Sequence, residues 1–274
     1  MQNKVMTDIQ DLTYLNWSHA RNSSGTAGTF LKSQSISDGK KIYYKLSNFD
    51  SEKGIIGHEC VNEIIVDRML TLLGVEHLAY QLIHANIEID GKSFETWVCA
   101  SEDFKERGET KAALDNYYQI NAGAGISHYD FCRENGWQQY IDTMLAVDFL
   151  ILNRDRHGAN IEVLRNARKH SIRIAPLFDP GLSLLCSCYS EEQIKKFNVM
   201  EDKPCQNFIG SRSTLENLNL IREKEKIFPK RLAGTDKAVI FENLEHTLSA
   251  EHMEKIWEMI YKRWCYYESL CNMG

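Results

Sequence analysis

The segment 152–160, which reads Leu-Asn-Arg-Asp-Arg-His-Gly-Ala-Asn, constrains the fold more than any other part of the chain. An apolar run at 144–151 precedes it, and a shorter one at 161–164 follows it. Its charged side chains therefore lie at the edge of a hydrophobic core, where each charge needs a partner. Such a cluster of charges is not expected to be present only for the stability of the fold. The segment predicts a functional loop between two buried elements.

A second acidic residue, Asp179, stands at the end of a second apolar run. Asp155 in the first segment is followed by Asn160 five residues later and by Asp179 about two dozen residues later. This order of acid, amide and acid is typical of phosphoryl-transfer sites of the protein-kinase type. In such sites the first Asp accepts the proton of an attacking hydroxyl. The Asn and the second Asp hold Mg²⁺ against the phosphates of ATP.

The composition indicates a globular protein of the cytoplasm. A chain of 274 residues is long enough for one large domain or two lobes with a sizeable core. The net charge of −6 argues against binding nucleic acid through a broad basic surface. The eight cysteines form no Cys-x-x-Cys pair, which favours reduced cytosolic thiols. We find no signal peptide and no apolar stretch long enough to cross a membrane.

Small residues are concentrated in the segment 21–30, where two glycines have serine and threonine neighbours. Such a segment lets backbone N–H groups approach an anion closely, but taken alone it is more often a plain loop. The β-branched and aromatic residues of 41–46 predict a strand after the polar turn 37–40. Lys45 on this strand could reach the phosphates of a nucleotide. The alternative is a solvated strand lysine.

Apolar residues recur at helical spacing over 58–73, and Gly74 suits the C-terminal cap of that helix. Glu59 and Glu63 lie one turn apart on one face of the helix. In kinases a helix glutamate pairs with the strand lysine and orients it. Either glutamate could pair with Lys45, although Glu63 fits the layout well. The alternative is that both are exposed helix acids.

The segments 77–89 and 94–100 predict strands that are joined by a turn at Asp90 and Gly91. This hairpin, with the lysine strand and the helix, resembles the N-lobe of a kinase, and 101–104 would be the hinge that meets adenine. We expect an α+β, two-lobed, protein-kinase-like fold. Residues 1–103 would form a small β-rich N-lobe, and residues 104–274 a larger α-helical C-lobe with the catalytic loop. Helices are predicted at 137–152, 216–226 and 236–273.

The motif Asn-Arg-Asp-Arg-His-Gly-Ala-Asn at 153–160, followed by Pro-Leu-Phe-Asp at 176–179, resembles the motifs of the HipA-like Ser/Thr kinases. These bacterial proteins include toxins of toxin–antitoxin pairs and share a core with the phosphatidylinositol 3/4-kinases. The resemblance runs from about residue 23 to the C-terminal helices, and the two motifs are specific when they occur in this order.

The resemblance implies a role for each residue of the site. Asp155 is the catalytic base, Lys45 contacts the ATP phosphates, and His157 braces the catalytic loop. Asn160 and Asp179 hold Mg²⁺. The other residues expected to contact the nucleotide lie on the helix, in the phosphate loop 23–29 and on the strand before the hinge: Glu63, Ser23, Ser24, Gly25, Thr26, Ala27, Gly28, Val98 and Ala100.

The resemblance also implies ATP and Mg²⁺ as cofactors and a protein substrate that is phosphorylated on Ser or Thr. An antitoxin or another regulatory protein is an expected partner, whereas direct contact with nucleic acid or a membrane is not expected. In HipA-like kinases a serine of the phosphate loop can be autophosphorylated, which ejects the loop. Ser23 and Ser24 are the candidates in this sequence.

The chain departs from the family pattern in two respects. It is shorter than the full-length toxin and has no room for an additional N-terminal domain before the phosphate loop. Asp179 is followed by Pro-Gly rather than Phe-Gly, so the Phe-driven switch of eukaryotic kinases does not carry over.

Two other functions use the same residues. A kinase fold does not determine its substrate, so the chain could phosphorylate a small molecule or a lipid. It could also be a pseudokinase that binds nucleotide and acts through a partner. The complete set of catalytic residues favours an active protein kinase over the pseudokinase.

Overall fold

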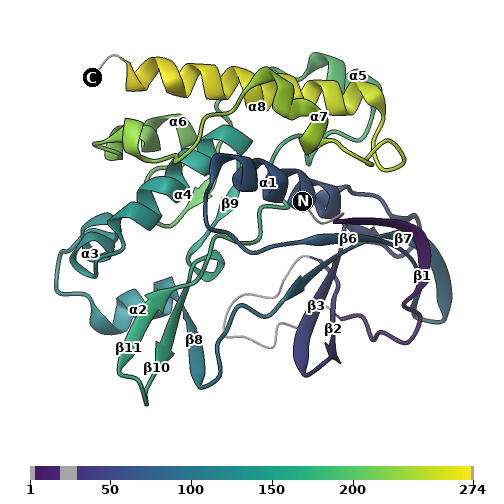
Figure 1. The fold of residues 1–274 in the computed structure, drawn as a ribbon, viewed down its shortest axis with the longest axis horizontal. Coiled ribbons are helices and arrows are strands. Elements are labelled where there is room, and N and C mark those ends of the chain that lie inside the picture. The colour runs from purple at the N-terminus through teal and green to yellow at the C-terminus, as the bar shows by residue number, and fades with distance from the viewer. Residues whose placement is uncertain (1–3, 19–29, 273–274) are drawn as a thin grey trace.

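The computed structural model describes residues 4–18 and 30–272, which form a β-rich part beside a larger helical part (Figure 1). The main sheet has five strands in the order β1-β6-β7-β3-β2. These strands are β1 (Val5–Asp11), β2 (Lys32–Ser37), β3 (Lys40–Leu46), β6 (Gln81–Ile89) and β7 (Lys92–Glu102). The predicted strand at 41–46 and the predicted hairpin are confirmed as β3 and as the pair β6–β7.

Tight turns join the antiparallel strands of this sheet. Asp90 and Gly91 have φ angles of 51° and 75°, and Asp38 and Gly39 have φ angles of 50° and 75°. Positive φ at both central residues produces the turn whose twist matches a two-residue hairpin. Asp tolerates this conformation, and Gly adopts it at no steric cost.

The N-terminal strand β1 pairs in parallel with β6, with Val5 opposite Leu82. The sequence analysis found no structure in the first 20 residues. Val5 is the one buried residue of this strand, and most of the other side chains face solvent. The strand therefore carries little of the alternating apolar pattern from which strands are predicted.

A second sheet of three strands, in the order β11-β10-β8, lies beside the first (Figure 1). The turn at 167–170 joins β10 to β11. The bounds are β8 (Glu109–Ala113), β10 (Glu162–Asn166) and β11 (Ser171–Ile174). Two short pairs are β4 (Phe49–Asp50) with β5 (Gly54–Ile55), and β9 (Asp155–Arg156) with β12 (Gln206–Asn207).

The longer helices match the sequence pattern, and the C-terminal ones are more broken than predicted. The helices are α1 (Glu59–Leu73), α2 (Leu114–Asn121), α3 (His128–Glu134), α4 (Gln138–Ile151), α5 (Glu191–Lys196), α6 (Thr214–Asn217), α7 (Lys237–Ile240) and α8 (Ala250–Cys271). The prediction of one continuous helix over 236–273 is wrong. The side chain of Ser249 accepts a hydrogen bond from the N–H of His252, so a separate helix, α8, begins after Ser249. The helix predicted at 216–226 is replaced by α6 and two short 3₁₀ turns.

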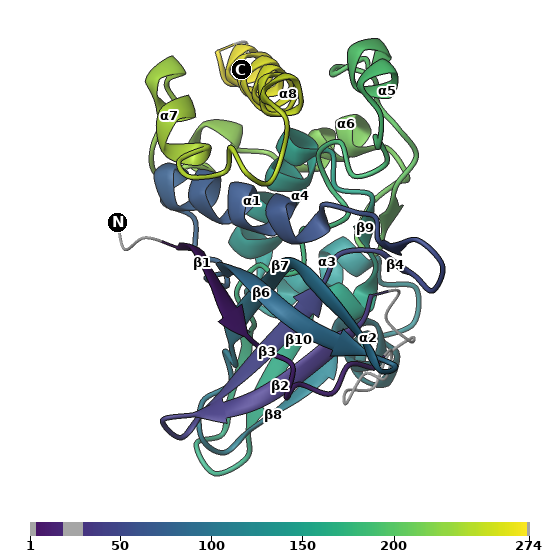
Figure 2. The same ribbon diagram turned by 90° about the vertical axis from the view of Figure 1, so that its right-hand side faces the viewer.

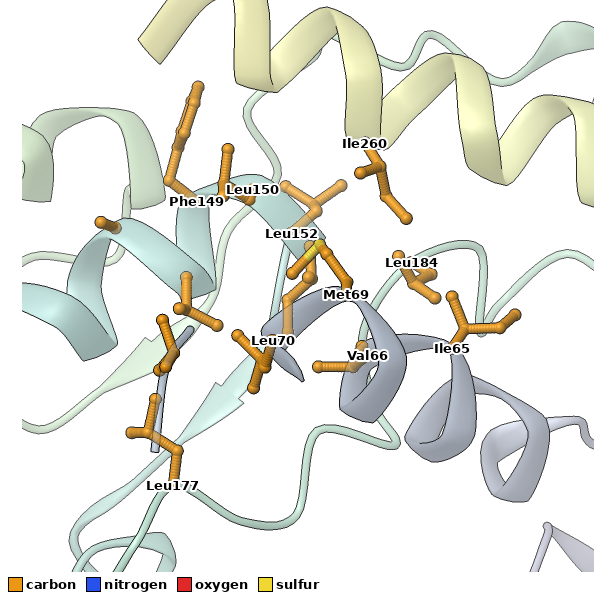
Figure 3. Close-up of a cluster of buried hydrophobic side chains, with 14 of the residues drawn as sticks. Ile65, Val66, Met69, Leu70, Phe149, Leu150, Leu152, Leu177, Leu184 and Ile260 are labelled. Carbon is orange, nitrogen blue, oxygen red and sulfur yellow. The ribbon is translucent and has the colours of Figure 1, made fainter. Parts of the chain in front are cut away.

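Helix α1 lies between the main sheet and α8 (Figures 1 and 2). Its buried side chains belong to one hydrophobic core with α4 and α8, and Gly74 ends the helix with a φ of 74°. Figure 3 shows Val66 and Leu70 of α1 facing the end of α4, and Ile260 of α8 above them. The helix that carries Glu63 is thus fixed by the core of the helical part. None of the described helices is both long and apolar enough to cross a membrane.

Two buried histidines connect the first turn of α1 to the first turn of α8. The rings of His58 and His252 meet edge to face at 4.5 Å. Each has a buried Nε2 atom without a hydrogen-bond partner among the described residues. Burial lowers the pKa of His58 to about 3 and that of His252 to about 4. Both histidines are therefore neutral in the folded protein near pH 7.

Acid is expected to destabilise the fold through this pair. An unfolded histidine titrates near pH 6.5, so below that pH the unfolded chain binds protons that the native state does not. The free energy of unfolding is unaffected by these histidines above pH 6.5 and decreases as the pH falls toward 4, by up to about 1.4 kcal/mol per pH unit for each histidine. Urea unfolding at pH 6 and pH 5 should show a shallower loss for His252→Phe than for the exposed control His246→Phe. Equal losses would contradict this origin of the acid sensitivity.

Candidate active site

Strand β3 delivers Lys45 to the face of the sheet that meets α1. Lys45 stands opposite Cys99 of β7, and Tyr43 stands opposite Ser101. These four residues line a cavity of about 560 Å³. The cavity lies between the main sheet and the second sheet, since Glu162 of β10 lines its far side.

Lys45 forms a buried ionic cluster with two carboxylates. Its Nζ atom lies 2.5 Å from Oε1 of Glu63 and also contacts Oδ1 of Asp179. Burial lowers the pKa of Lys45, but the charges of Asp179 and Glu63 outweigh burial and raise this pKa above its ordinary value. Lys45 is consequently a fixed positive charge on the cavity wall.

Glu63, rather than Glu59, pairs with the lysine. The Oε2 atom of Glu59 accepts the backbone N–H of Asn48 at 3.0 Å. Its carboxylate thus fixes the loop before α1, and burial raises its pKa. The structure resolves the alternative that the sequence left open.

Asp179 has a left-handed backbone conformation, with a φ of 57°. Its N–H donates a hydrogen bond of 2.9 Å to the hydroxyl oxygen of Tyr80. Tyr80 is buried, and burial raises its pKa well above the ordinary value, so the hydroxyl remains neutral. A non-glycine residue in this conformation is uncommon, and it is often found at functional sites.

The chain after Asp179 is tied to helix α1. The side-chain amide of Asn62 donates to the carbonyls of Gly181 at 3.1 Å and of Ser183 at 3.0 Å. A Cβ atom at position 181 would lie 3.1 Å from Oε1 of Glu63 and 3.2 Å from Nζ of Lys45. Glycine at this position therefore leaves room for the ion pair.

The segment 153–160, predicted to be a catalytic loop, is anchored by a buried ion pair between Asp148 and Arg156. Nη2 of Arg156 lies 2.9 Å from Oδ1 of Asp148, and both side chains are 2% exposed. Burial lowers the pKa of Arg156, but Asp148 reverses this effect and raises it. Nη1 of the same arginine donates to the carbonyl of Phe178 at 2.9 Å. The guanidinium thus joins the segment 153–160 to the residue before Asp179.

Asn153 connects the buried Asp148 to the backbone of Asp155 by two hydrogen bonds. Its amide donates to Oδ1 of Asp148 at 2.9 Å, and its side-chain oxygen accepts the N–H of Asp155 at 3.2 Å. Leu152, which ends α4, is fully buried with a φ of 51°. The backbone of the loop is therefore fixed on both sides of Asp155.

Asp155 and His157 face the solvent side of this loop, and their side chains are 27% and 25% exposed. Nε2 of His157 lies 3.6 Å from Oδ1 of Asp155. Nδ1 of His157 accepts the N–H of Ala159 at 3.2 Å, so the ring proton lies on Nε2 and faces the carboxylate. These contacts suit the bracing role predicted for His157.

Asn160 carries an unsatisfied oxygen. Its Nδ2 donates to the carbonyl of Asp155 at 2.7 Å, whereas its Oδ1 is buried without a hydrogen-bond partner among the described residues. Asn160 and Asp179 both line the cavity. Oxygen atoms of amides and carboxylates are suitable ligands for Mg²⁺, which uses few protein ligands beside phosphates and water. The residues present therefore fit the predicted metal.

Two phenylalanines and an ion pair form another part of the cavity wall. The rings of Phe104 and Phe178 lie 5.5 Å apart. Lys111 Nζ lies 3.1 Å from Oε1 of Glu162. Phe104 follows directly after β7, in the segment predicted to be a hinge. Aromatic faces beside a polar pair suit a flat, partly polar ligand.

The structure does not bring every predicted residue to this cavity. Val98 and Ala100 belong to a separate core on the other face of the main sheet. Side chains alternate between the faces of a strand, so their neighbours Cys99 and Ser101 line the cavity instead. The predicted phosphate loop, including Ser23, Ser24, Gly25, Thr26, Ala27 and Gly28, lies outside the described residues.

Several residues that line the cavity could not be predicted from the sequence, and Tyr80 and Lys32 are the two that contact Asp179. Tyr80 had no recognisable signal, because its contact with Asp179 joins positions 99 residues apart. Lys32 lies 3.9 Å from Oδ2 of Asp179 and also lines the cavity. Its position directly after the small-residue segment was the available signal.

The similarity of this chain to known proteins lies in its fold. No family model and no curated protein matches the chain. Among solved structures, it is similar to the proinflammatory kinase CtkA of Helicobacter pylori, with a TM-score of 0.65 and 16% identity over 97% of this chain and 99% of that one. It also matches HipA of a Shewanella oneidensis MR-1 toxin–antitoxin system, in a complex with HipB and operator DNA. That match has a TM-score of 0.42 and 13% identity, over 93% of this chain and 59% of HipA.

The likeness to CtkA extends over nearly the whole of both chains, so the two proteins share a fold. The kinase-like fold predicted from the sequence, with a β-rich sheet region and a helical C-terminal part, is confirmed.

Removing Asp148 is expected to destabilise the protein by about 3 kcal/mol, because it leaves the buried charge of Arg156 without its carboxylate. The measurement is urea unfolding of Asp148→Ala. The control is Glu192→Ala, which removes an exposed ion pair with Lys196 and should change stability by less than about 0.5 kcal/mol. Similar small effects for both variants would contradict an anchoring role for Asp148.

Proposed function

We propose that this protein is an ATP- and Mg²⁺-dependent phosphotransferase, and specifically a HipA-like serine/threonine protein kinase. One observation carries the proposal. Lys45, Glu63, Asn160 and Asp179 line a single cavity, and Asp155 is joined to it through its hydrogen bond with Asn160. Five polar residues that are scattered over 134 positions of sequence converge here in the order that phosphoryl transfer requires.

The cavity suits a nucleoside triphosphate. The aromatic pair of Phe104 and Phe178 would accept the base, and the polar groups of the cavity the sugar. Lys45, held by Glu63, would bind the phosphates. Asn160 and Asp179 would hold Mg²⁺, which neutralises phosphate charge when bound.

The chemistry proposed for the chain is proton transfer and positioning. The carboxylate of Asp155 would accept the proton of a Ser or Thr hydroxyl as the oxygen forms its bond to the γ-phosphorus. The bond from that phosphorus to the bridging oxygen breaks, and ADP leaves with the electron pair. His157 would orient the Asp155 carboxylate through its Nε2 proton. Lys45 would keep the phosphates in line for attack.

The protein substrate is the preferred acceptor because the Asp155 side chain does not line the cavity and is partly exposed to solvent. A side chain presented on a protein surface can approach such a carboxylate. Three further parts of the proposal rest on the sequence resemblance. They are action as a toxin or regulator, binding of an antitoxin or other regulatory partner, and autophosphorylation at Ser23 or Ser24. A small-molecule or lipid kinase and a nucleotide-binding pseudokinase are the competing functions.

Replacing Asp155 is expected to stop transfer without preventing ATP binding. A positioned base contributes about 10²- to 10⁴-fold, so Asp155→Ala and the shape-conserving Asp155→Asn should lose at least 10²-fold in rate. Transfer of ³²P from γ-labelled ATP is measured with protein, small-alcohol and phosphoinositide acceptors. The exposed carboxylate variant Asp8→Asn is the control.

Transfer that persists in both Asp155 variants would show that another group is the base. Transfer confined to alcohols or lipids would replace the substrate class. Binding of ATP without turnover on any acceptor would favour the pseudokinase. Phosphoproteomics of cells that express the wild type beside Asp179→Ala would then identify the substrates of an active enzyme.

The pairing of Lys45 gives a second prediction. Glu63→Gln removes the charge that orients Lys45 and should reduce kcat/KM for ATP by about tenfold, which corresponds to about 1.4 kcal/mol of transition-state stabilisation. Glu59→Gln changes a carboxylate one turn away that does not contact the lysine, and it should leave kcat/KM within about twofold. Equal losses in the two variants would contradict the assignment of Glu63.

A further inference from the structure

Asp179 has a backbone conformation that its place in the sequence disfavours. Its φ of 57° lies in the left-handed region, where residues other than glycine are uncommon. Pro180 follows it, and the residue before a proline prefers a φ of about −120°. A residue keeps such a conformation only when the surrounding structure holds it there. The contacts that hold Asp179 therefore decide where its carboxylate points.

Two hydrogen bonds fix the peptide group between residues 178 and 179. The N–H of Asp179 donates to the hydroxyl oxygen of Tyr80 at 2.9 Å, and the carbonyl of Phe178 accepts from Nη1 of Arg156 at 2.9 Å. Both ends of one peptide plane are thus bonded to distant side chains. Because φ of Asp179 is the rotation that begins at this peptide nitrogen, a fixed plane restricts φ.

Tyr80 is itself held in place by helix α1. Its backbone N–H donates to Oδ1 of Asp67 at 3.1 Å, and its side chain is buried. Asp67 is buried too, and it contacts Nζ of Lys4 at 2.6 Å and Nε2 of His77 at 3.2 Å. Tyr80 also lines the cavity beside Asp179. Its hydroxyl is therefore a fixed acceptor on the cavity wall.

The two bonds to the peptide group differ in what else they support. Arg156 also pairs with Asp148, so it anchors the segment 153–160 as well. Within the described part of the chain, the Tyr80 hydroxyl is hydrogen-bonded only to the N–H of Asp179. The hydroxyl thus serves the conformation of a single residue, whose carboxylate lines the cavity together with Asn160.

We propose that Tyr80 is a positioning residue for the metal site, whose hydroxyl holds Asp179 in the conformation that directs its carboxylate into the cavity. This inference rests on the proposed function, in which Asn160 and Asp179 hold Mg²⁺. Without the hydroxyl, the N–H of Asp179 loses its acceptor, and the residue can turn toward the conformation that Pro180 favours. Its carboxylate is then less well placed for the metal, whereas the other groups of the cavity keep their positions.

Amide hydrogen exchange tests the bond in the protein without ligand. Tyr80→Phe keeps the ring that packs in the core and removes the acceptor of the Asp179 N–H. This amide should exchange at least about tenfold faster than in the wild type, measured by NMR or by mass spectrometry of short peptides. An unchanged rate would show that the hydroxyl does not hold the amide and would overturn the proposal.

The coupling between metal and nucleotide tests the role in the site. Dissociation constants of the non-hydrolysable analogue adenylyl imidodiphosphate are measured by calorimetry in EDTA and with saturating Mg²⁺. The ratio of the two constants is the factor by which the metal strengthens nucleotide binding. A group that orients a metal ligand typically contributes about 10- to 100-fold to metal affinity. Tyr80→Phe should therefore lower the ratio by roughly tenfold and leave the constant in EDTA within about twofold.

Tyr267→Phe is the matched control. It removes the hydroxyl of a second buried tyrosine, which donates to the carbonyl of Lys224 at 2.6 Å in the helical part. Tyr267 does not line the cavity, so the ratio and the exchange rate at Asp179 should stay within about twofold of the wild type. Melting temperatures of the two variants close to each other would show that both retain the fold to the same degree.

The remaining outcomes separate this role from others. Equal weakening in EDTA and with Mg²⁺ leaves the ratio unchanged and overturns the positioning role, because the metal is then not involved. A ratio that falls equally in Tyr80→Phe and Tyr267→Phe also overturns it, because the loss is then a general structural effect. Either result leaves the proposed function standing. A wild type that binds the analogue in neither condition removes both the proposed function and this inference.

Discussion

The ionic cluster of Lys45, Glu63 and Asp179 is the interaction on which the site depends. It joins a strand of the main sheet, a helix of the central core and the segment after the second sheet. A lysine so far from water would tend to lose its proton, but the two carboxylates reverse that tendency. The two carboxylates hold the ammonium group at one position only while all three elements stay in place. The cluster therefore couples the relative position of the sheet and the helices to the state of the site.

Local features of this fold could be predicted from the sequence, because each has its signal within a few residues. Gly74 marks the end of α1, and Asp90 with Gly91 marks the β6–β7 turn. The catalytic loop was recognised for a related reason: charges between two apolar runs are costly unless they have partners. The partner of Arg156 lies only eight residues away, at Asp148. Short-range pairings of this kind leave a readable pattern.

The features that could not be predicted depend on contacts between distant positions. Strand β1 exists because it pairs with β6, more than 70 residues later, and its own side chains are mostly exposed. Whether Val98 and Ala100 face the cavity depends on which residues of the strand point to each face of the sheet. A shift of one residue exchanges the two faces, and Val98 and Ala100 lie on the face away from the cavity. Tyr80 illustrates the same limit, since nothing near it in the sequence indicates that its hydroxyl will meet the backbone of Asp179.

The segment 153–160 separates buried side chains that fix the backbone from side chains that solvent reaches. Asn153, Arg156 and Asn160 are buried. The first two donate hydrogen bonds to Asp148, and Asn160 donates one to the carbonyl of Asp155. By contrast, about a quarter of each of the Asp155 and His157 side chains is exposed. This alternation of buried and partly exposed side chains lets the core hold the backbone while solvent reaches the Asp155 carboxylate. Because the buried charges are costly when unpaired, they hold the loop in one arrangement. The cluster of charges that is difficult to explain by stability alone thus has a physical purpose, which is to hold one exposed carboxylate still.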